Sequence, residues 1–285
     1  MIGNNSCFNT FIEELPTIKE FHTRGEKVYN FLQKSFRGEV DKLFQNDIKD
    51  LSPFGEIVFP FHKMGNVDTT NLFDLDEIII FSFYWQARSR YKNVADLGAN
   101  VGLHSILLSK SGFNVKSYEP DSWHFSILEE NIKNNSCKNI ELFNCAVSDE
   151  VGEVEFIRVL GNTTSSHISG DKNPYGELET VVVDTVDFKS VIKWADFLKI
   201  DVEGHEVVLV TSTTKDDWND SDAMIEISNE DNAQKVFEFF NSIDVDMYSQ
   251  KKSWEKVTEL PDVPTSYKEG SLFVSNNGSP FSTEQ

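Results

Sequence analysis

Strand-like and helix-like segments alternate between residues 93 and 143, and this alternation restricts the fold more than any other feature of the chain. We expect strands at 93–97, 114–118 and 139–143, separated by helices at 101–111 and 121–134. Strands and helices that alternate at this spacing are typical of a parallel sheet covered by helices on both faces. The sequence therefore predicts an α/β fold with a doubly wound sheet.

The rest of the chain continues this sheet domain in one direction and extends it in the other. We expect two strands, 153–159 and 178–183, on either side of a long polar loop at 161–176, which is long enough to suggest a functional role. Further strands are expected at 197–200, 223–227, 245–249 and 271–275, with a helix at 232–243.

Residues 1–91 are predicted to form an N-terminal helical and cover segment. From about residue 8 to 50, apolar residues recur at intervals of three and four, as on one stripe of a helix. A short hairpin or extended cover is expected at 56–73, and a helix at 74–91. The predicted domains are thus 1–91, the sheet domain at 92–276 and a flexible tail at 277–285.

The charge of the chain excludes several classes of partner. Its 285 residues include 26 Lys and Arg against 47 Asp and Glu, a net charge of −21. Such a surface repels phosphate backbones and anionic lipid, so we expect neither nucleic acid nor membrane as a partner. We also find no signal peptide, no apolar stretch long enough for a membrane span and no CxxC spacing among the three cysteines, and we expect a cytoplasmic protein.

A glycine-containing turn follows the first strand of the alternating block, where ligands bind in open α/β sheets. The dinucleotide fingerprint GxGxxG, started at Gly98, would need glycines where the chain has Asn100 and Leu103. No GxxxxGK[ST] loop is present either. Because the second glycine of the fingerprint admits a pyrophosphate, a side chain at position 100 indicates a ligand without phosphates.

Glu119 ends the second strand, 21 residues after Gly98, and an acid at this distance can bind ribose hydroxyls. A ribose without phosphates is a feature of S-adenosyl-L-methionine, whose ammonium group Asp96 could contact. The alternative is that Asp96 and Glu119 only favour helix N-termini through their charge.

Several motifs together resemble the FkbM family of S-adenosylmethionine-dependent methyltransferases. They are VADLGANVG, SYEPD, CAVSD, a polar TSS segment and LKIDVEGHE followed by AMIEI, of which DVEGHE is the most specific. The resemblance runs from about residue 93 to 275. It implies a Rossmann-like class I methyltransferase fold with a seven-stranded, mostly parallel sheet whose last-inserted strand is antiparallel. It also implies O-methylation of sugars or other small hydroxylated molecules.

The resemblance implies a cofactor site at the ends of the first three strands. Glu119 would hold the ribose, with Pro120 and Asp121 towards the adenine. Many class I methyltransferases have an acid after the third strand; this chain has none there, so Asn144 or a backbone group of the next two residues is expected instead. The full set of expected cofactor contacts is Asp96, Gly98, Ala99, Asn100, Gly102, Glu119, Pro120, Asp121, Asn144, Cys145 and Ala146.

Catalytic residues are expected after the strand at 197–200, at the same edge of the sheet. A hydroxyl that attacks a sulfonium carbon must be positioned and must lose its proton, and a carboxylate or an imidazole can accept it. Asp201 and His205 are the expected bases, with Glu203 or Glu226 as alternatives, whereas Glu206 is interpreted as an acidic helix start. Acceptor contacts are expected from Ser165, Ser166 and Glu226, although the serines could also belong to an ordinary polar loop.

Asp201, Glu203 and Glu226 are also oxygen ligands of the kind that Mg²⁺ or Ca²⁺ takes, but no ligand spacing is diagnostic, so no metal is expected. The leading prediction is a methyltransferase for a small hydroxylated acceptor such as a saccharide or glycan. The alternatives are a binding or regulatory protein that keeps the fold without catalysis, a nucleic-acid methyltransferase and a nicotinamide oxidoreductase. The oligomeric state is not predicted.

Overall fold

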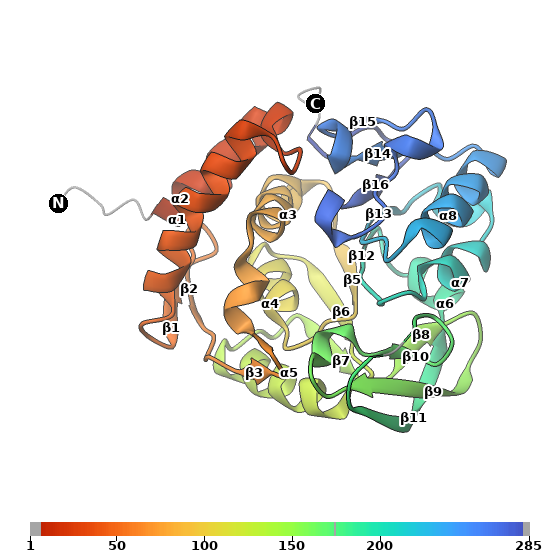
Figure 1. Ribbon diagram of the computed structural model, residues 1–285, viewed down its shortest axis with the longest axis horizontal. Coiled ribbons are helices and arrows are strands. Elements are labelled where there is room, and N and C mark those ends of the chain that lie inside the picture. Colours follow the sequence, from red (N-terminus) through yellow and green to blue (C-terminus); the bar gives the residue numbers. More distant parts are fainter. Residues whose placement is uncertain (1–6, 174, 282–285) are drawn as a thin grey trace.

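The computed structural model describes residues 7–173 and 175–281 (Figure 1). The predictions for residues 1–6 and 282–285, which are parts of the N-terminal segment and of the tail, lie outside the described residues. No helix within the described ranges is both long and apolar enough to cross a membrane.

The main sheet has eight strands within the described residues, in the order β15-β14-β16-β13-β12-β5-β6-β7. Their bounds are β5 Asn93–Leu97, β6 Asn114–Tyr118, β7 Ile140–Phe143, β12 Phe197–Ile200, β13 Asp222–Ile225, β14 Met247–Ser249, β15 Glu255–Lys256 and β16 Leu272–Val274. The five strands from β7 to β13 pair in parallel, and β16 is antiparallel to both of its neighbours. The sheet is therefore large and mostly parallel in its centre, as expected.

The number of strands differs from the expected seven. The extra strand, β15, lies between the expected strands at 245–249 and 271–275 and was not predicted. Its two residues pair antiparallel with Tyr248 and Ser249 of β14, at the edge of the sheet. The chain can reverse there because Ser253 and Trp254 both adopt positive φ angles, of 55° and 65°.

Strand order reverses beside β5, because β6 and β7 lie on one side of it and β12 and β13 on the other. Alternate strand residues face opposite layers. Val94 and Phe197 pack against α3 Leu75–Gln86, α4 Leu103–Lys110 and α5 Ser122–Asn134, whereas Ala95 and Leu198 pack against α6 Phe188–Ile192, α7 Glu206–Thr211 and α8 Glu230–Ser242. The sheet is thus covered on both faces, and its switch point lies between the ends of β5 and β12, where ligands bind in such folds.

The N-terminal residues form α1 Cys7–Glu14, α2 Lys27–Leu43 and two small hairpins, β1 Ile48–Asp50 with β2 Glu56–Val58 and β3 Lys63–Met64 with β4 Val67–Asp68. In Figure 1, α1 and α2 (red) lie outside α3 (orange). Their buried residues Phe8, Ile12, Phe36 and Val40 belong to the same hydrophobic core as α3 and one face of the sheet. The domain boundary at residue 91 remains a prediction.

A second sheet lies beside the carboxyl end of the main sheet, with the order β10-β9-β11-β8 (Figure 1). The predicted strands at 153–159 and 178–183 correspond to β9 Gly152–Val159 and β11 Leu178–Asp187, which pair antiparallel. β8 Ala146–Ser148 and β10 His167–Ile168 were not predicted.

The end of the described chain is packed, in contrast to the flexible tail expected from residue 277. Phe281 is 1% exposed, and its ring lies 5.0 Å from that of His22, 5.5 Å from Trp254 and 5.9 Å from Phe83. An apolar ring that fills a gap in the core is held there by burial, which a local reading of a polar, glycine-containing segment does not detect.

Candidate active site

A pocket opens at the switch point, between the carboxyl ends of β5, β6 and β12 and the second sheet. The lining residues are Leu97, Gly98, Asn100, Tyr118, Glu119, Pro120, His124, Cys145, Ala146, Val147, Phe156, Thr163, Thr164, Ser166, Ile168, Asp201, Val202, Glu203 and His205.

The glycine turn brings two strand ends into contact at the pocket. Gly98 has φ +79°, and a Cβ atom built on it would lie 1.9 Å from the carbonyl oxygen of Asp201. Only glycine permits both this backbone conformation and this approach. Gly102, with φ +89°, starts α4 against Leu128 and does not line the pocket, and neither does Ala99.

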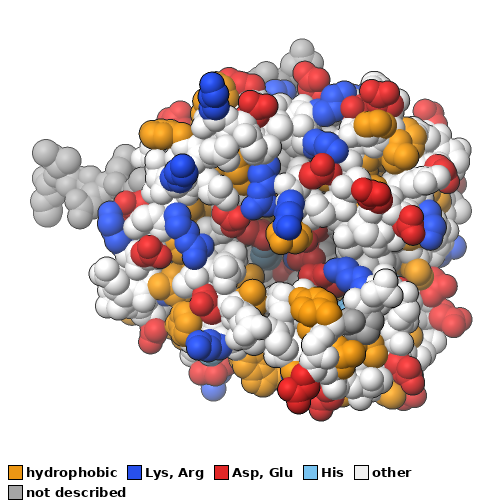
Figure 2. Space-filling view, in the orientation of Figure 1, with side chains coloured by type: hydrophobic (Ala, Val, Ile, Leu, Met, Phe, Trp, Pro, Cys, Tyr) orange, Lys and Arg blue, Asp and Glu red, His pale blue; other side chains and the backbone are white. Residues whose placement is uncertain are grey.

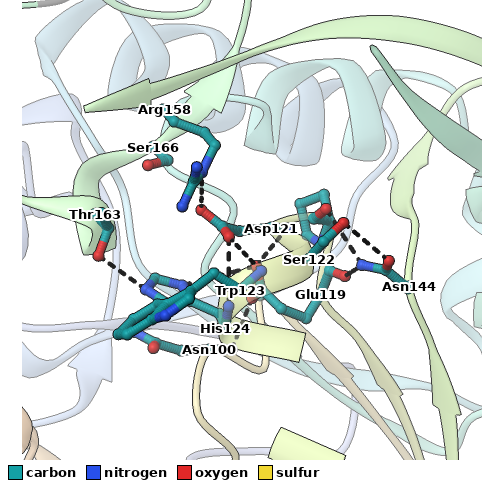
Figure 3. A network of polar contacts seen from close by, with 12 residues as sticks. Asn100, Glu119, Asp121, Ser122, Trp123, His124, Asn144, Arg158, Thr163 and Ser166 are labelled. Atoms are coloured by element: carbon teal, nitrogen blue, oxygen red, sulfur yellow. Dashed lines mark hydrogen bonds and ion pairs between the residues drawn. The ribbon is translucent and has the colours of Figure 1, made fainter. Parts of the chain in front are cut away.

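Asn100 and Glu119 meet across the floor of the pocket (Figure 3). The Asn100 backbone N–H donates to Glu119 Oε2 and the Asp121 N–H donates to Glu119 Oε1, both at 2.8 Å. Burial raises the pKa of Glu119 to about 8, although the two N–H donors act in the opposite direction. The Asn100 side-chain oxygen is buried and has no hydrogen-bond partner among the described residues.

Asp121 and Asn144 do not line the pocket; they brace the Glu119 turn from behind (Figure 3). Asp121 caps α5 by accepting from the Trp123 N–H, and it pairs with Arg158 Nε at 2.7 Å. Asn144 Nδ2 donates to the Glu119 carbonyl at 2.8 Å. A direct contact of either residue with a cofactor remains a prediction to which this geometry adds no support.

Other lining residues come from the second sheet and its neighbours, and several were not predicted. Cys145 and Ala146 line the pocket, and burial raises the pKa of the Cys145 thiol to about 11, so that it is neutral. His124, to which sequence reasoning gave no role, also lines it and shares a hydrogen bond of 2.9 Å with Thr163 Oγ1. Burial lowers its pKa to about 4, so this imidazole is uncharged. The remaining unpredicted members are Leu97, Tyr118, Val147, Phe156, Thr163, Thr164, Ile168 and Val202.

The two serines of the 161–176 loop have different positions. Ser166 lines the pocket, and its hydroxyl accepts from the Val159 N–H at 3.2 Å. Ser165 does not line it; its hydroxyl accepts from Asn162 Nδ2 at 2.8 Å. Only one of the two expected serine contacts therefore faces the pocket.

Asp201, Glu203 and His205 all line the pocket, but only Asp201 lacks a tie to the 161–176 loop in the described structure. Lys199 Nζ donates to Asp201 Oδ2 at 3.1 Å, and the Asp201 side chain is 29% exposed. Glu203 pairs with Lys172, and burial raises its pKa to about 7 although Lys172 lowers it.

His205 is held on both ring nitrogens. Nδ1 lies 2.9 Å from Asp171 Oδ2, and Nε2 lies 3.0 Å from Ser148 Oγ. Gly204, between the two tied residues, lies so close to the loop that a Cβ atom on it would be 3.0 Å from Asp171 Cβ. Glu203 and His205 therefore hold the loop against the end of β12.

Two further acids differ in their partners. Glu206 is buried and accepts from the Gly204 N–H, Ser228 Oγ and Asn232 Nδ2, which agrees with a structural role at the helix start. Glu226 follows β13 but does not line the pocket. Burial and the nearby charge of Asp201 raise its pKa well above the usual value.

Asp96 is buried beneath the pocket and does not line it. Its Oδ2 accepts from Ser105 Oγ at 2.6 Å, while its Oδ1 has no hydrogen-bond partner in the described chain and lies 3.9 Å from Lys199 Nζ. Lys199 was not predicted as a site residue. It lies inside β12, and only the pairing of β12 with β5 places it beside Asp96. In the described part of the chain, no set of three or more His, Cys, Asp or Glu side chains is arranged to hold a metal ion.

Comparisons with known proteins identify the family. The methyltransferase FkbM domain matches residues 96–250, which is more than half of the chain. No curated protein matches the sequence. Similar solved structures include the precorrin-6y C5,15-methyltransferase from Geobacter metallireducens GS-15, with 11% identity, a TM-score of 0.36 and coverage of 68% of this chain and 85% of that one. An O-methyltransferase from Bacillus cereus in complex with SAH has 10% identity and a TM-score of 0.38, with 68% and 78% of the two chains covered. The chain belongs to the FkbM methyltransferase family.

Proposed function

We propose that the chain is an S-adenosylmethionine-dependent methyltransferase that methylates a hydroxyl group of a small acceptor such as a saccharide or glycan. One observation carries the proposal: the glycine turn, the buried Glu119 and the open carboxylate of Asp201 meet in a single pocket at the switch point of the sheet. The family match supports methyl transfer, and the hydroxyl acceptor is our inference from the acid at this site.

The residues of the pocket fit the cofactor. When bound, S-adenosylmethionine supplies an electrophilic methyl group. Glu119 offers a carboxyl group that can bind ribose hydroxyls in either protonation state, and the unpartnered Asn100 oxygen offers a further acceptor. Tyr118, Phe156 and Ile168 give an apolar wall suited to a flat base.

Asp201 is the proposed proton acceptor. Lys199 Nζ donates to one of its carboxylate oxygens at 3.1 Å, and the other oxygen remains available to a hydroxyl in the pocket. Glu203 and His205 are engaged by the 161–176 loop, and Glu226 does not line the pocket, so these three are less suited to accept a proton.

Binding and turnover test the two parts of the proposal separately. Calorimetry with S-adenosylmethionine and S-adenosylhomocysteine should show binding to the wild type, and Glu119→Ala should weaken it by about 10-fold, since leaving the partners of a buried polar group unsatisfied costs roughly 1–3 kcal/mol. Glu141→Ala, an exposed acid on the next strand, is the matched control and should bind normally. If neither ligand binds the wild type, the methyltransferase proposal is wrong.

Asp201→Asn keeps the shape of the side chain and removes its basicity. We expect it to lower kcat by about 10²–10⁴-fold, the usual contribution of a positioned base, while the affinity for S-adenosylhomocysteine changes little. The assay is transfer of labelled methyl from S-adenosylmethionine to fractionated glycans and metabolites. Wild-type activity in the Asn variant would remove Asp201 from the role of base.

A further inference from the structure

A hydrogen-bonded chain of three side chains links α3 to α4 beside the candidate site. The Tyr84 hydroxyl lies 2.8 Å from His104 Nδ1, and His104 Nε2 lies 3.0 Å from Glu77 Oε2. Tyr84 and His104 are buried. Glu77 and Tyr84 precede the region that matches the family domain, which begins at residue 96.

The direction of the two hydrogen bonds between Tyr84, His104 and Glu77 follows from the residues at either end. A carboxylate can only accept, so His104 Nε2 carries the proton that is donated to Glu77. Nδ1 is then an acceptor for the Tyr84 hydroxyl, whose pKa is raised well above the usual value by burial, so that it keeps its proton. Both ring nitrogens are engaged, and Glu77 is therefore held in one orientation.

Glu77 is joined to the end of β5 through α4, because His104 binds Glu77 and the next residue, Ser105, donates to Asp96 Oδ2 at 2.6 Å. Burial alone would lower the pKa of Lys199, but the charges of Asp201, Asp96 and Glu77 together raise it, and the Glu77 charge also acts on Glu226. The Glu77 side chain is 26% exposed, similar to the 29% of Asp201. Figure 2 shows a hollow in this face of the molecule with Asp and Glu side chains on its floor.

The cluster also contains a buried oxygen that accepts no hydrogen bond from the described residues. Asp96 Oδ1 is fully buried, makes no hydrogen bond within the described residues and lies 3.9 Å from Lys199 Nζ, the atom that contacts Asp201. Native structures rarely leave such an oxygen without a donor, so a donor from outside the protein is the natural complement here. This observation is independent of the Glu77 chain and also points to a ligand on this side of the sheet.

We propose that Glu77 binds a second hydroxyl of the acceptor while the first reaches Asp201, and that His104 and Tyr84 are positioning residues that hold Glu77 in place. The inference rests on the proposed function and deepens it. Two carboxylates from different elements, with the Lys199 ammonium between Asp96 and Asp201, fit a compound with several neighbouring hydroxyls. The acceptor class is therefore a saccharide rather than a compound with a single hydroxyl, and the N-terminal segment completes its site.

Binding of saccharides to the enzyme loaded with S-adenosylhomocysteine tests the proposal without turnover. The probes are the methyl glycosides of glucose, galactose, mannose, rhamnose and N-acetylglucosamine, with 1-propanol as the single-hydroxyl comparison, observed by saturation-transfer NMR. We expect at least one glycoside to bind the wild type and 1-propanol not to bind. Glu77→Gln should weaken that glycoside at least 10-fold and leave the affinity for S-adenosylhomocysteine within 2-fold.

Two phenylalanine variants separate positioning from general stability. Tyr84→Phe should release His104 and weaken the glycoside about 3-fold or more, through KM rather than kcat. Tyr91→Phe is the matched control, because its buried hydroxyl makes a comparable bond of 2.6 Å to Asp222 at the opposite end of the strands, and it should leave binding unchanged. NMR of the His104 ring should show the Nε2–H tautomer in the wild type.

The outcomes distinguish this inference from the proposed function. Absence of cofactor binding would overturn the function itself. Normal cofactor binding with no bound glycoside, or with equal glycoside affinity in wild type and Glu77→Gln, would overturn the inference alone. An effect of Tyr84→Phe no larger than that of Tyr91→Phe would overturn the positioning role of the His104 chain.

Discussion

Gly98→Ala tests whether the glycine turn and the proposed catalytic strand depend on each other. The added Cβ would lie 1.9 Å from the Asp201 carbonyl oxygen, whereas real Cβ atoms essentially never approach closer than 3.0 Å. The ends of β5 and β12 must therefore separate by more than 1 Å, and the atom that moves is backbone, which cannot rotate away. The same substitution also forces alanine into a left-handed conformation at φ +79°.

The two costs can be separated with a second glycine. Gly112 has φ +98° and nothing within 4 Å of a built Cβ, so Gly112→Ala pays only the conformational cost, roughly 1–2 kcal/mol. Gly98→Ala adds the cost of forcing atoms into a packed site, about 1–3 kcal/mol. At about 2–4 °C per kcal/mol for a protein near this size, we expect Tm to fall by about 2–8 °C for Gly112→Ala and by about 4–20 °C for Gly98→Ala.

Thermal unfolding of both variants, measured in parallel with calorimetry of S-adenosylhomocysteine, gives the test. Gly98→Ala should lose affinity for the ligand as well as stability, because Gly98 and Asp201 both line the pocket. Gly112→Ala should lose stability only. Equal Tm values and equal affinities for the two variants would refute the close approach of the strand ends.

Two further predictions concern buried groups. Phe281→Ala should lower the free energy of unfolding by about 3 kcal/mol, because the ring is buried. Tyr267→Ala is the control: 57% of this residue is exposed, so the free energy of unfolding should change by less than about 0.5 kcal/mol. Denaturant titration of both variants gives the comparison, and equal effects would contradict the packing of Phe281. Burial raises the pKa of Glu119 from 4.5 to about 8, so its protonated form adds stability that is complete below pH 4.5 and is lost as pH rises through 8. Glu119→Gln lacks this titration. The free energy of unfolding of the variant, relative to that of the wild type, should therefore rise by up to about 3 kcal/mol between pH 5.5 and 8. A difference between the two proteins that stays constant with pH would contradict the raised pKa of Glu119.

The bounds of the central strands could be predicted to the residue, because the local sequence is enough to indicate a short buried strand. β5, β6 and β12 have the same bounds in the structure as in the sequence prediction. Each is short, and β5 and β12 are rich in apolar residues, as expected for parallel strands that are covered on both faces. The turn after β5 and the acids after β6 and β12 follow directly from these bounds, so the part of the site that lies on the main sheet was also predictable.

The side of the pocket that the second sheet forms depends on pairing between distant segments, which local sequence patterns do not reveal. Phe156 lines the pocket because β9 pairs with β11, more than 20 residues further along the chain. Thr163 and Ile168 reach it through the loop between these strands. Nothing in the polar sequence of that loop distinguishes Ser166, which faces the pocket, from Ser165, which does not.

Residues of one chemical type acquire different roles here through their partners, and this explains why a motif alone does not assign them. In DVEGHE, Asp201 is bound by a lysine from its own strand and keeps a free oxygen towards the pocket. Glu203 is bound by Lys172 and therefore holds a loop, and Glu206 is fully bonded to backbone and side chains and therefore holds a helix start. The motif places three carboxylates within six residues, but charge and hydrogen bonding from distant segments leave only the first of them available to a substrate.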